Sequence, residues 1–187
     1  MAQQTTAIVK QKKRWFTVLS PELFGSREMA DLPAFNVEDI KGRVVEVTGQ
    51  MLTGSPKDAN KKYQLKITEM KGEKAVTVPV YYAITDSHIQ RTARRYKERF
   101  IDVLTLVTKD NQKVLIKMQF FHTKRLHHSV RASLLKESGQ MIKDMFKEIE
   151  TAKLFDPLTV DKIGNDLRKA LAKIYPIEKI MVARLEF

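Results

Sequence analysis

Hydrophobic and polar residues alternate along much of the chain. Tyr63, Leu65 and Ile67 are separated by polar residues, which is the period-2 pattern of a strand with one buried face. The β-branched residues at 44–47 predict an earlier strand, and residues 75–82 predict a later one. We therefore expect this part of the chain to form a sheet.

Residues 101–107 and 114–121 form the clearest predicted hairpin. Both runs are rich in apolar residues, and the polar segment 109–112 between them predicts a turn. Pro79, inside the preceding strand, cannot donate a ladder hydrogen bond and so favours a bulge or a sheet edge. Residues 15–36 contain several turn signals and are predicted to be mostly loop with short extended pieces.

The pattern changes from a strand period to a helix period near residue 85. Thr85 or Asp86 is a suitable N-cap for a helix, because each side chain can accept a hydrogen bond from the first turn. Ile89, Ala93 and Tyr96 then recur at spacings of four and three. We expect these three side chains to share one face of a short helix.

Two apolar stripes at helical spacing follow in the last third of the chain. The first comprises Met141, Ile142, Met145, Phe146 and Ile149, and the second comprises Ile163, Leu167, Ala170, Leu171 and Ile174. Asp156-Pro157 is expected to break the first helix, and a second helix is predicted over 159–174. The second stripe is predicted to be core. The first is rich in methionine and fits either core or an adaptable contact surface.

These patterns predict an α+β fold in one domain. A strand-rich core is expected over 40–122, helices over 129–175 and a closing strand over 177–187. Hydrophobic residues make up 43% of the chain, which is enough for a real core. Residues 1–14 are polar and then basic, so they are predicted to form a flexible arm before the domain at 15–187.

The charge balance indicates a polyanionic partner. The chain has 34 lysines and arginines against 22 acidic residues, for a net charge of +12. A compact domain repels itself at this charge, so nucleic acid is favoured ahead of an anionic membrane or an acidic protein. The chain has no cysteine, which excludes disulfides, thiolate nucleophiles and cysteine-based zinc sites. No apolar run resembles a secretory signal or approaches the ~20 residues that span a bilayer, so we expect a soluble intracellular protein.

Basic residues interleaved with aromatic ones are the strongest functional signal. The predicted RNA-binding residues are Lys10, Lys12, Lys13, Arg14 and Trp15 in a first cluster, Arg91, Arg94, Arg95, Lys97 and Arg99 in a second, and Lys124, Arg125, His127 and Arg131 in a third. Guanidinium groups bind phosphate oxygens in a fork, and aromatic faces stack on unpaired bases. A solvated charged face would explain one such cluster, but three at this net charge favour RNA or DNA. Taken alone, Trp15 and Phe16 are more typical of core anchors than of base stackers.

Signatures of catalysis and of metal binding are missing from the sequence. It contains no P-loop, no dinucleotide-binding glycine motif and no nucleophile elbow. His122, His127 and His128 lie near the third cluster, but none has a second ligand at a chelating spacing, so no metal or other cofactor is expected. Asp102 and Asp110 could hold Mg²⁺ in a nuclease, which is the best enzymatic alternative.

Short motifs recur along the chain in a recognisable order. They are Lys12-Lys13-Arg14-Trp15-Phe16, Ser20-Pro21-Glu22-Leu23-Phe24-Gly25, Lys41-Gly42-Arg43-Val44-Val45-Glu46-Val47, Leu52-Thr53-Gly54, Val107-Thr108-Lys109-Asp110, Lys113-Val114 and Ala172-Lys173-Ile174-Tyr175-Pro176-Ile177. Together they resemble the S3Ae family of small-subunit ribosomal proteins, which archaea and eukaryotes share. The family usually has glycine where this chain has Asn111, and asparagine also adopts the left-handed conformation of such a turn.

The resemblance implies a β-barrel-like core of about six or seven strands with C-terminal helices packed alongside. It also implies a cytoplasmic, non-catalytic protein that binds rRNA on the small-subunit platform near the mRNA exit. Neighbouring ribosomal proteins are then expected partners, and mRNA is a further candidate. The long basic extensions of eukaryotic members are absent, so we expect an archaeal-type chain or one from a reduced eukaryote. The alternative of the same class is an RNA-binding or chaperone protein outside the ribosome.

Overall fold

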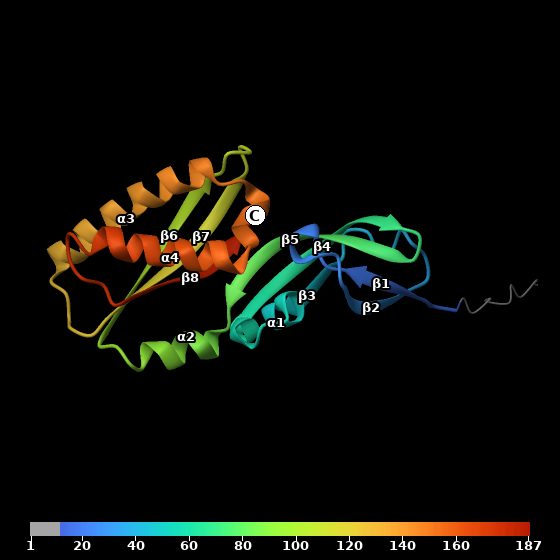
Figure 1. The fold of residues 1–187 in the computed structure, drawn as a ribbon, viewed down its shortest axis with the longest axis horizontal. Coiled ribbons are helices and arrows are strands. Elements are labelled where there is room, and N and C mark those ends of the chain that lie inside the picture. Colours follow the sequence, from blue (N-terminus) through green and yellow to red (C-terminus); the bar gives the residue numbers. More distant parts are fainter. Residues whose placement is uncertain (1–11) are drawn as a thin grey trace, which may run out of the picture.

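The computed structural model describes residues 12–187, which form one open sheet with helices alongside (Figure 1). The eight strands in this part of the chain are β1 (Arg14–Leu19), β2 (Glu28–Ala34), β3 (Val44–Thr48), β4 (Lys61–Lys71), β5 (Lys74–Ile84), β6 (Glu98–Val107), β7 (Lys113–His122) and β8 (Lys179–Glu186). Its helices are α1 (Gly49–Thr53), α2 (Asp86–Ala93), α3 (His128–Glu148) and α4 (Pro157–Leu171), with 3-10 turns η1 (Glu22–Phe24), η2 (Pro56–Asn60) and η3 (Thr151–Phe155). The expected α+β class is confirmed, and the open sheet is compatible with a barrel-like core.

The molecule is elongated (Figure 1). One part contains β1 to β4, the other contains β6 to β8 with α3 and α4, and both parts belong to the same sheet. The strand order is β2-β1-β5-β8-β7-β6, and β4 pairs with β5 and β3. β5 belongs to both parts, because it pairs with β1 and β4 and its last residues pair with β8. Lys61 on β4 strengthens the junction, since its Nζ lies 2.9 Å from a carboxylate oxygen of both Asp58 and Asp161. This buried lysine links η2 to α4.

The segment 15–36 is more regular than its sequence predicts. β1 and β2 form an antiparallel pair, and Ser20 Oγ accepts a hydrogen bond of 2.8 Å from Arg27 N in their connection. Pro33 lies within β2, where it is tolerated because β2 is an edge strand. The expectation of mostly loop is therefore wrong, since the turn-forming residues occupy the connection and the edge rather than interrupting the pair.

The other predicted strands and the predicted hairpin are confirmed. β6 and β7 pair in continuous antiparallel register from Glu98–His122 to Val107–Lys113. The register of β4 and β5 shifts beside Pro79, so the predicted bulge is present. Asn111 has a φ of 57° in the turn between β6 and β7, which is the left-handed conformation expected there.

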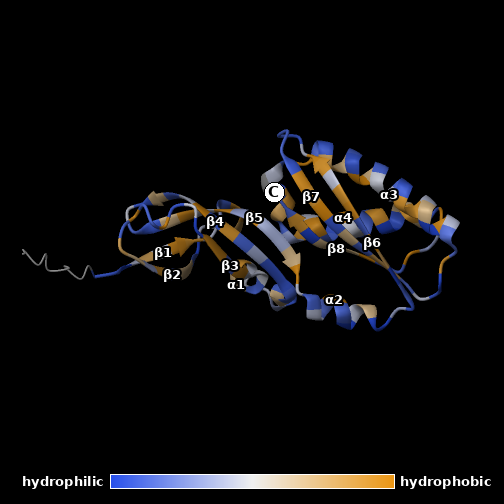
Figure 2. Cartoon of the chain, turned by 180° about the vertical axis from the view of Figure 1, so that it is seen from behind, coloured by the Kyte–Doolittle hydropathy of each residue, from blue (hydrophilic) through white to orange (hydrophobic). Residues whose placement is uncertain are grey.

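α3 and α4 pack on β6, β7 and β8 and enclose the larger hydrophobic core. Ile142 and Phe146 of α3 are fully buried, as are Leu167 and Leu171 of α4, so both stripes contribute to the core. Met145 is half-buried at the edge of the first stripe. Figure 2 shows that hydrophobic residues are prominent along β6 and β7, whereas α2 is mainly hydrophilic.

The boundaries of the two C-terminal helices differ from the prediction. α3 ends at Glu148, and Pro157 is the first residue of α4 rather than a breaker of α3. Proline is favoured at this position because the first helical N–H has no partner within the helix. α4 ends at Leu171, and Ile174 beyond it is 43% exposed, so the prediction that Ile174 points inward is wrong.

Candidate nucleic-acid interface

Two connections lie side by side at one end of the molecule, namely the one between α2 and β6 and the one between β7 and α3 (Figure 1). Glu98 and His122 are paired across the strands, and Lys97 N donates a hydrogen bond of 3.1 Å to His122 O. The Glu98 carboxylate also accepts a hydrogen bond from Leu126 N. The fold thus brings the second and third basic clusters together, although the 24 residues 100–123 separate them in the chain.

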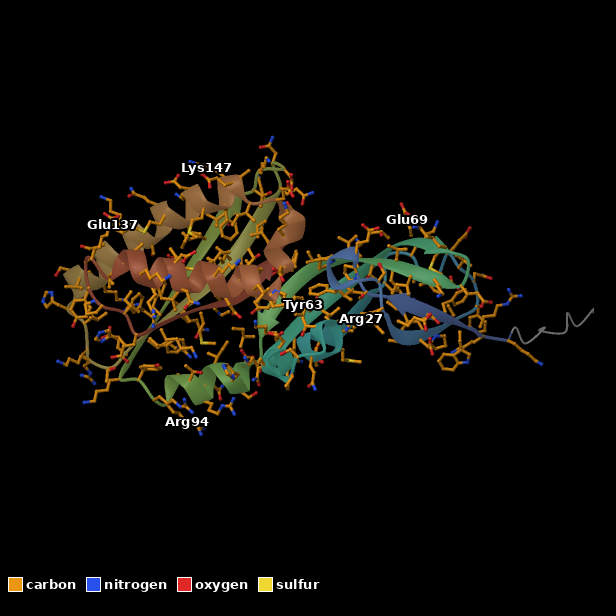
Figure 3. All side chains as sticks on the ribbon, in the orientation of Figure 1. Arg27, Tyr63, Glu69, Arg94, Glu137 and Lys147 are labelled. Atoms are coloured by element: carbon orange, nitrogen blue, oxygen red, sulfur yellow. The ribbon has the colours of Figure 1, made fainter. Side chains whose placement is uncertain are left out.

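The predicted cations at this end of the molecule are all exposed. They are Arg91, Arg94, Arg95, Lys97, Arg99, Lys124, Arg125 and Arg131. We call this surface the basic end. Figure 3 shows Arg94 pointing outward from the end of α2. Glu98 is the only acidic residue in segments 91–99 and 122–131, and Glu178, from the segment before β8, also reaches this end and accepts a hydrogen bond from Thr123 Oγ1. The cations therefore greatly outnumber the acids there.

The local electrostatics of His88 reflect this concentration of positive charge. His88 lies on α2, and its Nδ1 is 3.1 Å from a guanidinium nitrogen of Arg91. Partial burial lowers the pKa of His88, and the charges of Lys179, Arg91 and Arg95 lower it further. A surface that disfavours a proton on histidine favours an approaching anion.

The three histidines of the third cluster have different roles. His122 is 5% exposed, and its ring nitrogens contact the backbone of Lys124 and the carbonyl oxygen of Pro176, the latter at 3.0 Å. It therefore holds the β7–α3 connection against the segment before β8. His127 is the exposed N-cap of α3, and its Nδ1 accepts a hydrogen bond from Ser129 N. His128 is exposed in the first turn of that helix.

Cations outside the three sequence clusters also lie near this end. One is Lys179, whose charge lowers the pKa of His88, and another is Lys173. Lys173 is exposed, and it comes two residues before Tyr175, whose ring centre is 5.1 Å from that of His122. Arg168 and Lys169, a few residues earlier, are a weak local signal of a basic surface. The packing of the α4–β8 connection against His122 places Lys173 near the basic end.

The first cluster lies at the opposite end of the molecule (Figure 1). Lys10 lies outside the described residues, and Lys12, Lys13 and Arg14 are exposed. Arg14 is the first residue of β1, and residues 1–11 of the predicted arm lie outside the described residues. This cluster is therefore separate from the basic end.

Trp15 and Phe16 occupy contrasting environments. Phe16 is 3% exposed and is confirmed as a core residue. Trp15 is 66% exposed, so the prediction that it is a core anchor is wrong. Neighbouring residues of a strand point to opposite faces, which explains the difference. Near them, Lys13 Nζ lies 5.5 Å from the ring centre of Phe35, which is also partly exposed. Two accessible aromatic rings thus accompany the cations of this end.

The two acids of the nuclease alternative are not arranged as a metal site. Asp102 is half-buried within β6, and burial raises its pKa. Asp110 lies in the turn beyond β6 and accepts a hydrogen bond of 2.9 Å from Thr151 N, which lowers its pKa. At about 3.3 Å per strand residue, the two carboxylates are too far apart to share one ion. No group of three metal-ligating side chains occurs within residues 12–187.

An α+β domain with exposed cations gathered at its ends has the features of a nucleic-acid-binding protein. The sequence matches the Ribosomal S3Ae family over residues 3–187. Small ribosomal subunit protein eS1 of Archaeoglobus fulgidus is 26% identical over 189 residues, which cover 98% of this chain and 90% of that protein. The protein of the same name from Thermoplasma acidophilum is 30% identical over 176 residues, which cover 94% of this chain and 82% of that protein.

The chain therefore belongs to the Ribosomal S3Ae family, and the resemblance carried by its motifs is confirmed. This is a family of ribosomal proteins, so the chain is a ribosomal structural protein and not an enzyme. No helix within residues 12–187 is long and apolar enough to cross a membrane.

Proposed function

We propose that this chain is a structural constituent of the small ribosomal subunit and binds rRNA mainly through the basic end. The observation that carries the proposal is the joining, on a hydrogen-bonded scaffold, of two basic segments that contain Glu98 as their single acid. The relatives named as small ribosomal subunit proteins support the assignment. We further propose a position in the cytoplasm on the platform of the subunit, beside other ribosomal proteins and near the mRNA exit, which the family resemblance supports.

The binding mechanism is neutralisation of phosphates on a pre-formed surface. Arginine forks onto phosphate oxygens, and each contact releases condensed counterions from the RNA. The backbone hydrogen bonds between the two connections fix the spacing of the cations before RNA arrives. Such a surface recognises the shape of the RNA backbone rather than its base sequence.

The first cluster provides a second, smaller contact at the far end of the molecule. Lys12, Lys13 and Arg14 supply charge there, and Trp15 offers an exposed ring on which an unpaired base can stack. Because the two basic surfaces lie at opposite ends, the chain can connect separate RNA segments. A protein that bridges RNA segments stabilises their relative arrangement, which is a structural role.

The salt dependence of rRNA binding tests the role of the basic end. The variant Arg91→Ala/Arg94→Ala/Arg95→Ala should bind small-subunit rRNA more weakly, and the slope of log affinity against log salt should fall by roughly one per lost phosphate contact. The matched control is Lys136→Ala/Lys143→Ala/Lys147→Ala, which removes the same charge from exposed positions on α3. An unchanged slope in the arginine variant, or an equal loss in the control, would show that these arginines do not contact phosphates.

A further inference from the structure

A recess lies where β3, β4, β5, β7 and β8 meet the start of α2. It has a volume of about 440 Å³, and its lining includes Lys62, Tyr81, Lys117, Gln119 and Arg184. Ile116 and Met118, which alternate with Lys117 and Gln119 along β7, belong to the core under α3 and α4. The recess is therefore on the sheet face opposite those helices.

Two like charges stand opposite each other in this recess. Lys117 of β7 and Arg184 of β8 are register partners, and both line the cavity. Like charges in directly paired positions destabilise a sheet. Neither cation forms a salt bridge with another group in residues 12–187. A bound anion would turn this unfavourable pair into a favourable one.

The remaining charges of the recess leave these two cations available. Lys62 continues the same row, since it pairs with Ala83, which in turn pairs with Arg184. The Lys62 ammonium is bound to the Glu46 carboxylate at 2.6 Å, so this pair is internally neutralised. Asp86, in the first turn of α2, is the other acid in the lining.

Unsatisfied polar atoms mark the deeper wall of the recess. Gln119 is 4% exposed, and its Oε1 has no hydrogen-bond partner within the described part of the chain. Thr85, the N-cap of α2, also lines the recess, and its buried Oγ1 is likewise without a partner there. Buried polar atoms are normally hydrogen-bonded, so these two atoms can accept hydrogen bonds from a polar ligand or from water.

Tyr81 adds a planar surface beside the cations. The Arg184 guanidinium carbon lies 5.3 Å from the centre of the Tyr81 ring. Guanidinium planes and aromatic rings are the surfaces on which proteins stack unpaired bases. The recess therefore combines anion-binding cations, a stacking surface and an unsatisfied amide within one small volume.

We propose that this recess binds a single unpaired nucleotide of the RNA that the protein contacts. Lys117 and Arg184 bind its phosphate, and the amide of Gln119 forms hydrogen bonds with the edge of its base. The proposal rests on the proposed function in RNA binding and gives it a specific, base-recognising element. The volume is in the range of small-ligand sites, so it suits one nucleotide rather than a helix.

Nuclear magnetic resonance titration of the full chain tests this site directly. The probes are the four ribonucleoside monophosphates and, separately, inorganic phosphate. At least one nucleotide should shift the Gln119 side-chain amide signals in a saturable way and bind more tightly than phosphate. The variant Lys117→Gln/Arg184→Gln should weaken that binding by about tenfold or more, since it removes charge-assisted hydrogen bonds.

Two single variants separate recognition from folding. Gln119→Leu should abolish the preference among nucleotides without lowering the melting temperature, because it removes an amide oxygen that has no partner in the free protein. Lys113→Gln removes one charge from β7 outside the recess and should bind like the original protein. Binding of phosphate equal to that of every nucleotide, or no saturable nucleotide binding, would overturn the proposal.

Failure of the recess proposal can be distinguished from failure of the proposed rRNA-binding function. If only the recess is wrong, Lys117→Gln/Arg184→Gln still binds rRNA like the Lys113→Gln control, and the nucleotides show no preference. If the wild-type chain fails to bind small-subunit rRNA at all, the proposed function is wrong whatever the nucleotides do.

Discussion

His88 is the residue whose protonation is most directly coupled to the basic end. Its pKa is lowered from the ordinary value of 6.5 by burial and by Lys179, Arg91 and Arg95. Since the unfolded chain binds this proton more readily, the contribution of His88 to stability is complete above about pH 6.5 and is lost as the pH falls towards the folded pKa. A bound phosphate would offset the neighbouring cations and raise this pKa.

We therefore predict that the imidazole titration of His88 moves to higher pH in two situations. One is the variant Arg91→Ala, which removes a nearby cation, and the other is saturation with small-subunit rRNA. Histidine resonances followed by nuclear magnetic resonance against pH measure both shifts. An unchanged titration of His88 in the RNA complex would mean that phosphates do not approach this side of α2.

Individual residue environments were only partly predictable from the sequence. The exposure of the second and third basic clusters follows from charge alone, because an unpaired cation is rarely buried. Trp15 and Phe16 are both large and aromatic, and which of them is buried depends on the face that β1 turns to the core. The role of His122 depends on Pro176, which lies 54 residues away, so no local pattern could reveal it.

Two glycines within helices provide a matched test of how closely the elements pack. A Cβ added at Gly139 of α3 would meet Leu104 at 3.9 Å, which is ordinary contact. A Cβ added at Gly164 of α4 would lie 3.1 Å from the Ile180 carbonyl oxygen of β8. α4 thus approaches the backbone of β8 closely at Gly164.

Gly139→Ala is predicted to raise the free energy of unfolding by up to about 1 kcal/mol, because alanine favours a helix. Gly164→Ala should lose this gain, or lower the free energy of unfolding, because α4 or β8 must move to admit the methyl group. Urea denaturation of both variants gives the comparison. Equal stabilisation by the two substitutions would contradict the close approach of α4 to β8.

The two helical stripes differ in depth, which predicts different costs of truncation. Leu167 is fully buried, so Leu167→Ala should lower the free energy of unfolding by about 2–5 kcal/mol. Met145 is half-buried and flexible, so Met145→Ala should cost less. Thermal melts of the two variants compare them. An equal loss of stability would place Met145 as deep in the core as Leu167.

At the scale of elements, periodicity predicted whether a segment is a helix or a strand better than it predicted where that element begins and ends. The β6–β7 hairpin and the two C-terminal helices were predictable because each has a long apolar pattern of one period. β1 and β2 were not, because their strands are short and their connection is rich in turn-forming residues. The start of α4 at Pro157 shows the ambiguity of proline, which ends one helix pattern and begins another equally well.

At the scale of the whole molecule, the sequence predicted basic clusters but not their arrangement. The second and third clusters meet because antiparallel pairing returns β7 to the start of β6. The first lies at the far end because β1 and β2 are distant from β6 in the strand order. Such placement depends on strand order, which periodicity does not encode. The nucleotide-sized recess was also invisible to the sequence, since its walls come from six separate elements.

Sedimentation of small ribosomal subunits in high salt tests the proposed structural role most directly. A tagged copy of this chain, expressed in the organism that encodes it, should remain with the small subunit at salt concentrations that remove loosely associated basic proteins. Non-specific electrostatic binding weakens steeply with salt, whereas an integrated constituent also has protein contacts and shape complementarity. Release of the chain into the top fractions, together with small subunits that keep their other proteins, would contradict the role of structural constituent.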